Sequence, residues 1–229
     1  LNIIKNGPSE RRRFIDMELC QLDKVYVHSL VQYNKVLLQR NKLLKELGFH
    51  PEYEATLDVW DEQLVRFGKE VIKARRAFIH QLGDIIKEMH TKLSGGKENI
   101  EVIYDPDTEE NELEEAVRKS RPQDMKQKTT LAGPHRDDIS FVVNGIDIRR
   151  FGSQGQQRTA ALSLKLSELE LVKKISRDDP VLLLDDVLSE LDSSRQNQLL
   201  DAIQDIQTMI TCTGLEDFVN HRFHIDKIF

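Results

Sequence analysis

The chain has 229 residues, of which 39% are hydrophobic and 31% charged, and its formal net charge is −6. This composition is typical of a globular protein with a substantial core, and it excludes a disordered or fibrous chain. No apolar run reaches the roughly 18 residues of a membrane span, so no membrane partner is predicted. The acidic net charge gives no sign of nucleic-acid binding, so any contact with DNA must come from a local basic patch.

The two cysteines and the first residues bear on where the protein works. Cys20 and Cys212 lie far apart, outside any CxxC pair or metal-binding His cluster. We therefore expect neither a disulfide framework nor a zinc site, and we expect a protein of the reducing cytoplasm. The chain starts at Leu1 with neither a Met nor a signal peptide. We expect it to be cut from a longer protein.

Two long amphipathic helices are predicted in the first part of the chain. Apolar residues recur at a spacing of three and four over residues 12–47 and again over residues 51–93. Gly48 with Pro51 stops the first helix, and Gly95-Gly96 stop the second. Their short connection predicts an antiparallel hairpin. The core of an ordinary helical bundle would give the same pattern, so this stripe implies no function.

After Gly96 the pattern changes to alternating strands and helices. Asn144-Gly145 predicts the two-residue turn of a β-hairpin over residues 140–148. The other predicted strands cover residues 99–104, 181–184, 208–212 and 223–228, and the predicted helices cover 109–125, 155–175 and 193–206. Alternation of this kind indicates an α/β fold. We expect a mainly helical lobe over residues 1–125 and an α/β portion over residues 126–229.

A predicted buried strand ends in two carboxylates, Asp185 and Asp186. The apolar run 181–184 is typical of a strand buried on both faces, and α/β proteins bind ligands at the carboxyl edge of such strands. One carboxylate can hold Mg²⁺ there, usually through water, and the other can orient or deprotonate an attacking water. Taken alone, the segment has a less favoured alternative, a buried strand followed by a polar turn.

A small polar loop, residues 151–158, opens the helix predicted after the hairpin. Ser153 is a candidate N-cap, and Gly155 lets the backbone come close to an anion. The free N–H groups and the dipole of the helix then form a phosphate site. An ordinary helix cap is the alternative when the loop is taken alone. The Asp pair and the Ser-Glu-Leu-Asp segment 189–192 that follow favour a nucleotide site.

In order and spacing, these segments resemble the signature loop, Walker B strand and D-loop of ABC-type ATPases. The resemblance implies that Ser153 and Gly155 contact ATP held by a second subunit of a homodimer. Gln154 and Gln156 would support that contact.

The same resemblance gives roles to the residues farther along the chain. It implies that Asp185 is the Walker B ligand of Mg²⁺. Asp186 stands where the superfamily usually has a catalytic Glu, and its shorter side chain has less reach toward the attacking water. Ser189 and Asp192 match the D-loop, which lines the dimer seam. Thr213 falls at the position of the switch His and is the candidate for sensing the γ-phosphate.

Finer details resemble the RecF family of bacterial DNA-repair proteins. The segments that carry this likeness are residues 7–16, 130–138, 152–159 and 183–192. The resemblance implies a DNA-stimulated ATPase that uses ATP and Mg²⁺, and a recombination mediator that acts in gap repair. The resemblance also implies that such a protein works with RecR and RecO to load RecA at gaps. The DNA it binds would be either duplex or a junction between single and double strands.

The phosphate-binding loop GxxxxGK[S/T] does not occur in the chain. In the RecF pattern this loop precedes the point where the chain starts. We therefore expect the C-terminal half of an ABC-type head plus an α-helical lobe with a long helical hairpin, inactive alone. Two alternatives stay open: a non-catalytic module that binds RecR or DNA, and a chromosome-maintenance ATPase, although the arms of that class are far longer.

Basic residues in the helical lobe are candidates for contact with DNA. Arg11, Arg12 and Arg13 form a short run, and Lys73 and Arg76 lie on the second predicted helix. Such clusters can neutralise phosphates of the DNA backbone. A solvated helix face is the alternative.

Overall fold

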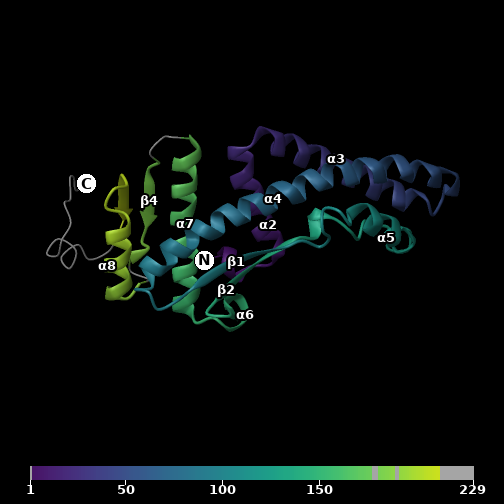
Figure 1. Cartoon of the computed structure of the whole chain (residues 1–229). Helices are drawn as coiled ribbons and strands as arrows, with labels where there is room; N and C mark the ends of the chain where they lie inside the picture. Colours follow the sequence, from purple (N-terminus) through teal and green to yellow (C-terminus); the bar gives the residue numbers. More distant parts are fainter. Residues whose placement is uncertain (1, 177–179, 189–190, 212–229) are drawn as a thin grey trace.

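The computed structural model describes residues 2–176, 180–188 and 191–211. A long helical hairpin extends from one end of the molecule, and a smaller α/β layer lies at the other (Figure 1). The hairpin consists of α3 (Lys24–Glu46) and α4 (Leu57–Leu93), joined through the 3-10 helix η1 (Pro51–Thr56). Most of the apolar residues on the predicted stripe of α4 are buried, and α4 packs against α3, which confirms the predicted hairpin. The positive φ angles of Gly95 and Gly96, 62° and 75°, follow the end of α4.

The first predicted helix, 12–47, is two helices in the structure. After α1 (Asn2–Lys5), α2 covers Pro8–Leu22, and the chain turns at Asp23 before α3 begins. Asp23 has extended dihedral angles, and its carboxylate accepts hydrogen bonds from the backbone N–H groups of Val25 (2.7 Å) and Tyr26 (3.2 Å). The prediction of one continuous helix was wrong because apolar spacing carries across a break that a capping side chain stabilises.

An antiparallel sheet lies along the side of α4. Its strands are β1 (Ile100–Asp105), β2 (Asp138–Val143) and β3 (Ile146–Asp147), in the order β1-β2-β3. Asn144 and Gly145 have φ angles of 51° and 79° in the turn between β2 and β3, which confirms the predicted hairpin. Between β1 and β2 lie α5 (Leu113–Gln127) and η2 (Pro134–Arg136). Strand β1 belongs to the predicted lobe 1–125, and β2 and β3 belong to the predicted α/β portion 126–229, so the sheet joins the two. The predicted domain boundary between them stays a prediction.

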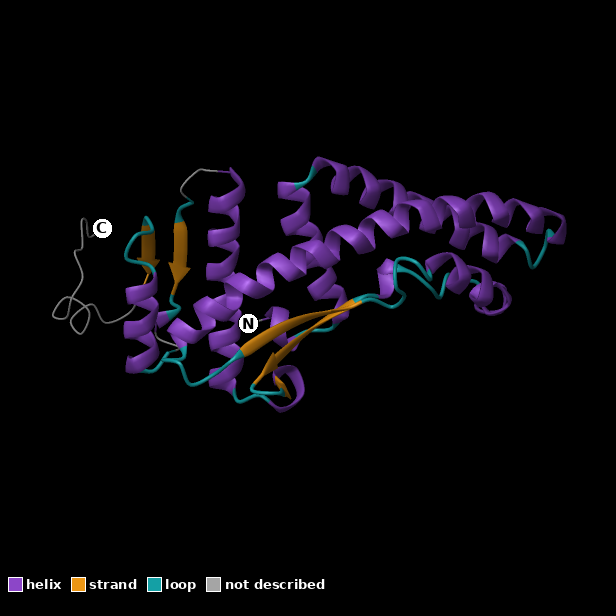
Figure 2. Cartoon of the chain, viewed as in Figure 1, coloured by secondary structure: helices purple, strands orange, loops and turns teal. Residues whose placement is uncertain are grey.

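The remaining elements form the α/β layer. They are α6 (Ile148–Phe151), α7 (Gln154–Ser176), β4 (Leu182–Asp185), α8 (Ser193–Ala202) and β5 (Thr208–Thr211). Strands β4 and β5 pair in parallel, with Leu182 opposite Thr208. Figure 2 shows these two strands beside α7 and α8, with α6 at the foot of α7. The strand predicted over 223–228 lies outside the described residues.

Helix α4 connects the two ends of the molecule. It contacts α3 and α5 in the hairpin region, β1 in the middle, and α7 and α8 in the α/β layer, so one hydrophobic core runs through both parts. At Gly68 a Cβ atom would lie 2.7 Å from the Leu113 side chain and 3.2 Å from the Tyr33 ring. Glycine is therefore required where α3 and α5 press against α4. No helix in the described part of the chain is both long and apolar enough to cross a membrane.

A buried carboxyl on α7 predicts a dependence of stability on pH. Glu168 Oε2 contacts Lys165 Nζ at 2.8 Å, and Oε1 is buried with no hydrogen-bond partner in the described part of the chain. Burial, and then the nearby carboxylate of Glu18, raise the pKa of Glu168 from 4.5 to about 7. Between these two values the folded state holds a proton that the unfolded chain has released. The free energy of unfolding therefore falls as pH rises through this window.

Glu168→Gln is expected to flatten that pH dependence and to raise the free energy of unfolding at pH 8 by about 2 kcal/mol. Urea unfolding at several pH values measures both effects. Exposed Glu88 on the neighbouring helix α4 provides the control, because Glu88→Gln removes a carboxylate that is already solvated. Parallel pH profiles for Glu168→Gln and the parent protein would contradict the assignment.

Candidate functional site

The loop before α7 forms a reciprocal cap. The backbone N–H of Gln156 donates to Ser153 Oγ at 3.2 Å, and the backbone N–H of Ser153 donates to Gln156 Oε1 at 3.0 Å. Ser153 and Gln154 are exposed, so the start of this 23-residue helix opens to solvent. The first N–H groups of a helix have no partner within it, and the helix dipole is positive at this end. This end of α7 therefore has the properties of an anion site.

Gly155 lies against a guanidinium group from α8. A Cβ atom at Gly155 would be 3.1 Å from Arg195 Nη1. Arg195 Nη1 donates to Asp192 Oδ2 at 2.7 Å, and the Arg195 backbone N–H donates to Asp192 Oδ1 at 3.0 Å. These hydrogen bonds, the backbone one first, lower the pKa of Asp192, which caps α8. The structure therefore brings Gly155 and Asp192 together through Arg195, a residue that sequence reasoning missed.

The paired carboxylates lie at the carboxyl edge of the parallel strands, as the sequence predicts. Thr211 Oγ1, from the neighbouring strand β5, donates to Asp185 Oδ1 at 2.5 Å. Asp186 has a φ angle of 51°, a left-handed conformation that few residues other than Gly, Asn and Asp adopt. Its backbone N–H donates to the Thr211 carbonyl at 3.1 Å. Both side chains are exposed.

The Asp pair fits one kind of metal ion better than others. No cluster of three or more His, Cys, Asp or Glu side chains converges anywhere in the described ranges, which leaves one or two carboxylates as protein ligands. Mg²⁺ keeps much of its water and is commonly held by one or two carboxylates plus substrate phosphates. Strands β4 and β5 point toward the end of the α/β layer at which α7 starts (Figure 2). Ser189 and Thr213, also predicted for this site, lie outside the described residues.

The predicted run of basic residues on α2 is split by the structure. Arg11 is 1% exposed and forms a two-pronged ion pair with Asp138, at 2.6 and 2.8 Å. It joins α2 to β2 and is not at the surface where a phosphate of DNA would contact it. Arg12 is half-buried, and its Nη1 donates to the Asp137 carbonyl at 2.6 Å. Arg13 is exposed.

The two basic candidates on α4 also differ in their surroundings. Lys73 is exposed. Arg76 pairs with Glu109, and its guanidinium lies 5.5 Å from the centre of the Tyr104 ring. A contact between Arg76 and DNA would have to compete with both neighbours, so Lys73 is the more accessible of the two.

The segment 130–138 forms a buried polar network beneath α2 and α4. Arg75, 2% exposed, donates to Asp16 Oδ1 at 2.8 Å and to Asp137 Oδ2 at 2.9 Å. Burial raises the pKa of Asp137, although Tyr104 and Arg75 oppose that change. His135 Nε2 lies 3.1 Å from the Thr130 carbonyl, which only accepts, so this nitrogen carries the proton. The contacts described make this segment a structural connection between helices.

The chain is similar to bacterial DNA-repair proteins. No protein-family model matches it. The DNA replication and repair protein RecF of Lachnospira eligens is 62% identical over 231 residues, which cover 100% of this chain and 64% of that protein. RecF of Lachnoclostridium phytofermentans is 60% identical over 229 residues, with the same two coverages. RecF of Clostridium perfringens is 46% identical over 234 residues. The chain thus spans less than two thirds of the length of these relatives.

Solved structures of similar proteins share the fold. The recombination mediator protein RecF in the RecFOR pathway superposes with a TM-score of 0.84 in its ATP form and 0.83 in its ATPrS form. Sequence identity is 38% and 39%, over 94% and 93% of this chain and 60% of each of those chains. The Smc head domain of Pyrococcus furiosus, 17% identical, gives a TM-score of 0.51 over 93% of this chain and 53% of that chain. These similarities confirm the predicted fold class, part of an ABC-type ATPase head joined to a helical lobe.

Proposed function

This chain belongs to the RecF family, and from that premise we propose that it acts within an ATP-dependent, DNA-binding recombination mediator in recombinational DNA repair. The relatives are named DNA replication and repair proteins, and a solved relative is named a recombination mediator in the RecFOR pathway. The proposed partners are DNA, RecO and RecR, the proposed outcome is the loading of RecA at gaps, and the proposed location is the cytoplasm. Because the chain spans 64% of its relatives, these are activities of the whole protein.

ATP hydrolysis is proposed at the seam of a head-to-head homodimer. The observation that carries this proposal is the exposed start of α7, where Gly155 lies beside Arg195 and its partner Asp192. Ser153 and Gly155 would contact the phosphates of ATP bound to the second subunit, with Gln154 and Gln156 holding the loop. Asp192, with Arg195, would line the seam. Ser189 and Thr213 stay predictions for the same seam.

The carboxylates at the end of β4 have separate proposed roles. Asp185, oriented by Thr211, would hold Mg²⁺, and the ion when bound neutralises charge on the phosphates of ATP. Asp186 would orient or deprotonate the attacking water. For contact with DNA we propose the exposed side chains of Arg13 and Lys73 first, with Arg12 and Arg76 in support.

Ser153→Arg is expected to abolish ATP-driven dimerisation of the full-length protein while leaving ATP binding to the monomer within about threefold of the parent. The long cationic side chain would occupy the space that the phosphates and the second subunit require. Light scattering with and without ATP measures the dimer, and a nucleotide titration measures monomer binding.

Gln81→Arg, which introduces the same cationic side chain at an exposed position of α4, is the control. This variant should dimerise as the parent does. An ATP-dependent dimer of the Ser153→Arg protein at the parent's ATP concentration would overturn the assignment of Ser153 to the seam.

A further inference from the structure

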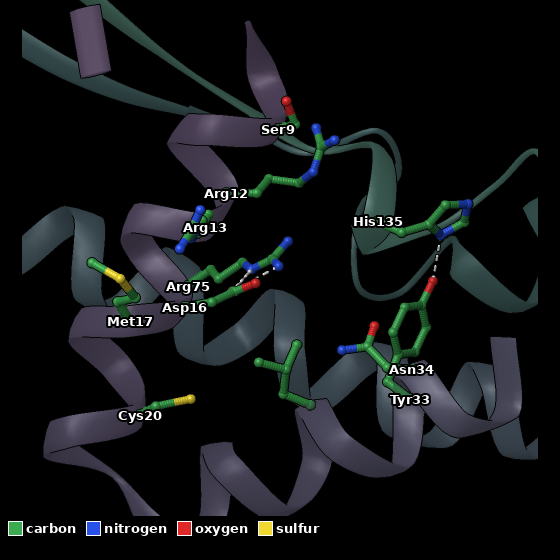
Figure 3. Close-up of a pocket in the computed structure, with 11 residues that line it drawn as sticks. Ser9, Arg12, Arg13, Asp16, Met17, Cys20, Tyr33, Asn34, Arg75 and His135 are labelled. Atoms are coloured by element: carbon green, nitrogen blue, oxygen red, sulfur yellow. Dashed lines mark hydrogen bonds and ion pairs between the residues drawn. The ribbon is translucent and has the colours of Figure 1, made fainter. Parts of the chain in front are cut away.

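A pocket lies away from the α/β layer, between α2, α3, α4 and η2. Its volume is about 470 Å³, within the range of small-molecule sites. Figure 3 shows Arg12 reaching from α2 toward the segment that carries His135, with Tyr33 and Asn34 on the facing helix α3. None of the lining residues comes from α7, β4 or α8. The pocket is therefore separate from the seam proposed for ATP.

The charges that line this pocket are unbalanced. Three guanidinium groups, from Arg12, Arg13 and Arg75, meet one carboxylate, that of Asp16. Arg75 is already neutralised, because it pairs with Asp16 and with buried Asp137. The positive charges of Arg12 and Arg13 remain without an acidic partner within ion-pair distance in the described part of the chain.

Arg12 retains donors for a ligand. Its guanidinium has five N–H groups, and the hydrogen bond described for it is the one from Nη1 to the Asp137 carbonyl. Burial first, and then repulsion from Arg75, lower the pKa of Arg12, and the carboxylates of Asp138, Asp137 and Asp16 oppose that change. An anion bound beside Arg12 would add to this opposition. The hydroxyl of Ser9 and the amide of Asn34, both at exposed positions of the lining, are further donors.

The imidazole of His135 is not available as a ligand group. Its Nε2–H donates to the Thr130 carbonyl, so Nδ1 accepts from the Tyr33 hydroxyl at 2.7 Å. Burial lowers the pKa of His135 and keeps the ring neutral. The cationic end of the pocket is therefore built by α2.

The opposite part of the lining is apolar, with Met17, Cys20 and Leu30. Met17 is 48% exposed, so apolar surface stands open next to the two guanidinium groups. A bare anion would leave this surface uncovered. A ligand with a phosphate at one end and a sugar and base at the other would cover both parts, and guanidinium forks match phosphate oxygens well.

We infer that this pocket binds one phosphate-bearing nucleotide unit, with Arg12 and Arg13 on the phosphate and Met17 and Leu30 against the sugar or base. The unit comes either from a free nucleotide or from a nucleotide within a DNA strand. The inference requires neither Ser153 nor Asp185. Experiments without ATP and Mg²⁺ therefore test it independently of the proposed ATPase.

Cys20 provides a reporter inside the pocket. It is a free, partly exposed thiol among the lining residues. Burial, and then the carboxylate of Asp16, raise the pKa of this thiol, so alkylation is best measured at a pH of about 8.5, where more thiolate is present. Mass spectrometry of the peptide that contains Cys20 separates its labelling from that of any other cysteine in the full-length protein.

The test compares Cys20 alkylation rates with four small probes and one oligonucleotide: dTMP, thymidine, inorganic phosphate, an oligoglutamate peptide and a 5′-phosphorylated oligo-dT. We expect dTMP or the oligonucleotide to slow alkylation by about threefold or more at saturation. Protection by dTMP identifies a free nucleotide as sufficient, and protection by the oligonucleotide alone identifies a DNA strand as the source. Arg13→Gln should raise the ligand concentration needed for half-maximal protection by about tenfold, as expected when one charged phosphate contact is lost.

Arg118→Gln, which removes an exposed arginine of α5, is the matched control and should leave protection unchanged. Protection by thymidine or by inorganic phosphate equal to that by dTMP would overturn the inference, since only part of the proposed ligand would then be recognised. Equal protection by oligoglutamate would assign the pocket to an acidic protein segment instead. Absence of protection, or protection unchanged in Arg13→Gln, would also overturn it.

Discussion

Asp185→Asn is expected to lower the Mg²⁺-dependent ATP hydrolysis rate of the full-length protein by about 100-fold or more. The change removes the negative charge at the end of β4 that would hold the ion against the phosphates of ATP. ATP binding without Mg²⁺ should change little, because the carboxylate contributes through the ion. Steady-state phosphate release over a range of Mg²⁺ concentrations measures the effect, and excess Mg²⁺ should restore only part of the rate.

The fold should survive this substitution. The asparagine carbonyl can still accept the hydrogen bond from Thr211 that Asp185 accepts now. Asp201→Asn changes another exposed aspartate, on neighbouring α8, and serves as the control with an unchanged rate. A hydrolysis rate for Asp185→Asn within about threefold of the control would remove Asp185 from the metal site.

Arg75→Leu is expected to reduce the free energy of unfolding by about 3–5 kcal/mol. The side chain of Arg75 is 3% exposed, and it donates to Asp16, to Asp137 and to the Pro134 carbonyl at 2.6 Å. Without it, the Asp137 carboxylate, 1% exposed, would be buried with no cation beside it. Urea unfolding followed by circular dichroism measures the loss.

The neighbouring residue gives a matched control. Arg76→Leu removes a guanidinium that is 45% exposed and paired with Glu109 at the surface, so its cost should stay below about 1 kcal/mol. Arg75→Lys, which keeps a charge but loses the two-pronged geometry, should fall between the two. If Arg75→Leu cost no more than Arg76→Leu, the network around Asp137 would not be a main source of stability.

Local sequence signals predicted the parts of the fold that depend on local chemistry. Asn144-Gly145 indicated the β2–β3 turn because few other residues adopt its positive φ angles. The stripe of α4 indicated a long buried helix because its period matches the helical turn. The break at Asp23 was missed because apolar spacing on both sides of it continues in phase, although Asp is a favoured N-cap residue.

The candidate site also has parts that could be predicted from the sequence and parts that could not. The order of loop, strand and Asp pair could be predicted because each motif is continuous in sequence. The place of Arg195 against Gly155 could not, since it depends on how α8 packs beside the start of α7. Arg11 illustrates the opposite error: its basic neighbours suggested a surface patch, whereas its partner Asp138 lies 127 residues farther along the chain. Only the tertiary fold distinguishes a buried ion pair from a patch.

The uninterrupted course of α4 has a mechanical consequence. At 37 residues the helix is about 55 Å long, and it contacts α7 and α8 at one end and α3 at the other. A tilt of about 5° at the end near α7 would displace the far end by about 5 Å, by the geometry of a rod of that length. A load applied to the hairpin tip would therefore be coupled through α4 to a shift of the loop that carries Ser153.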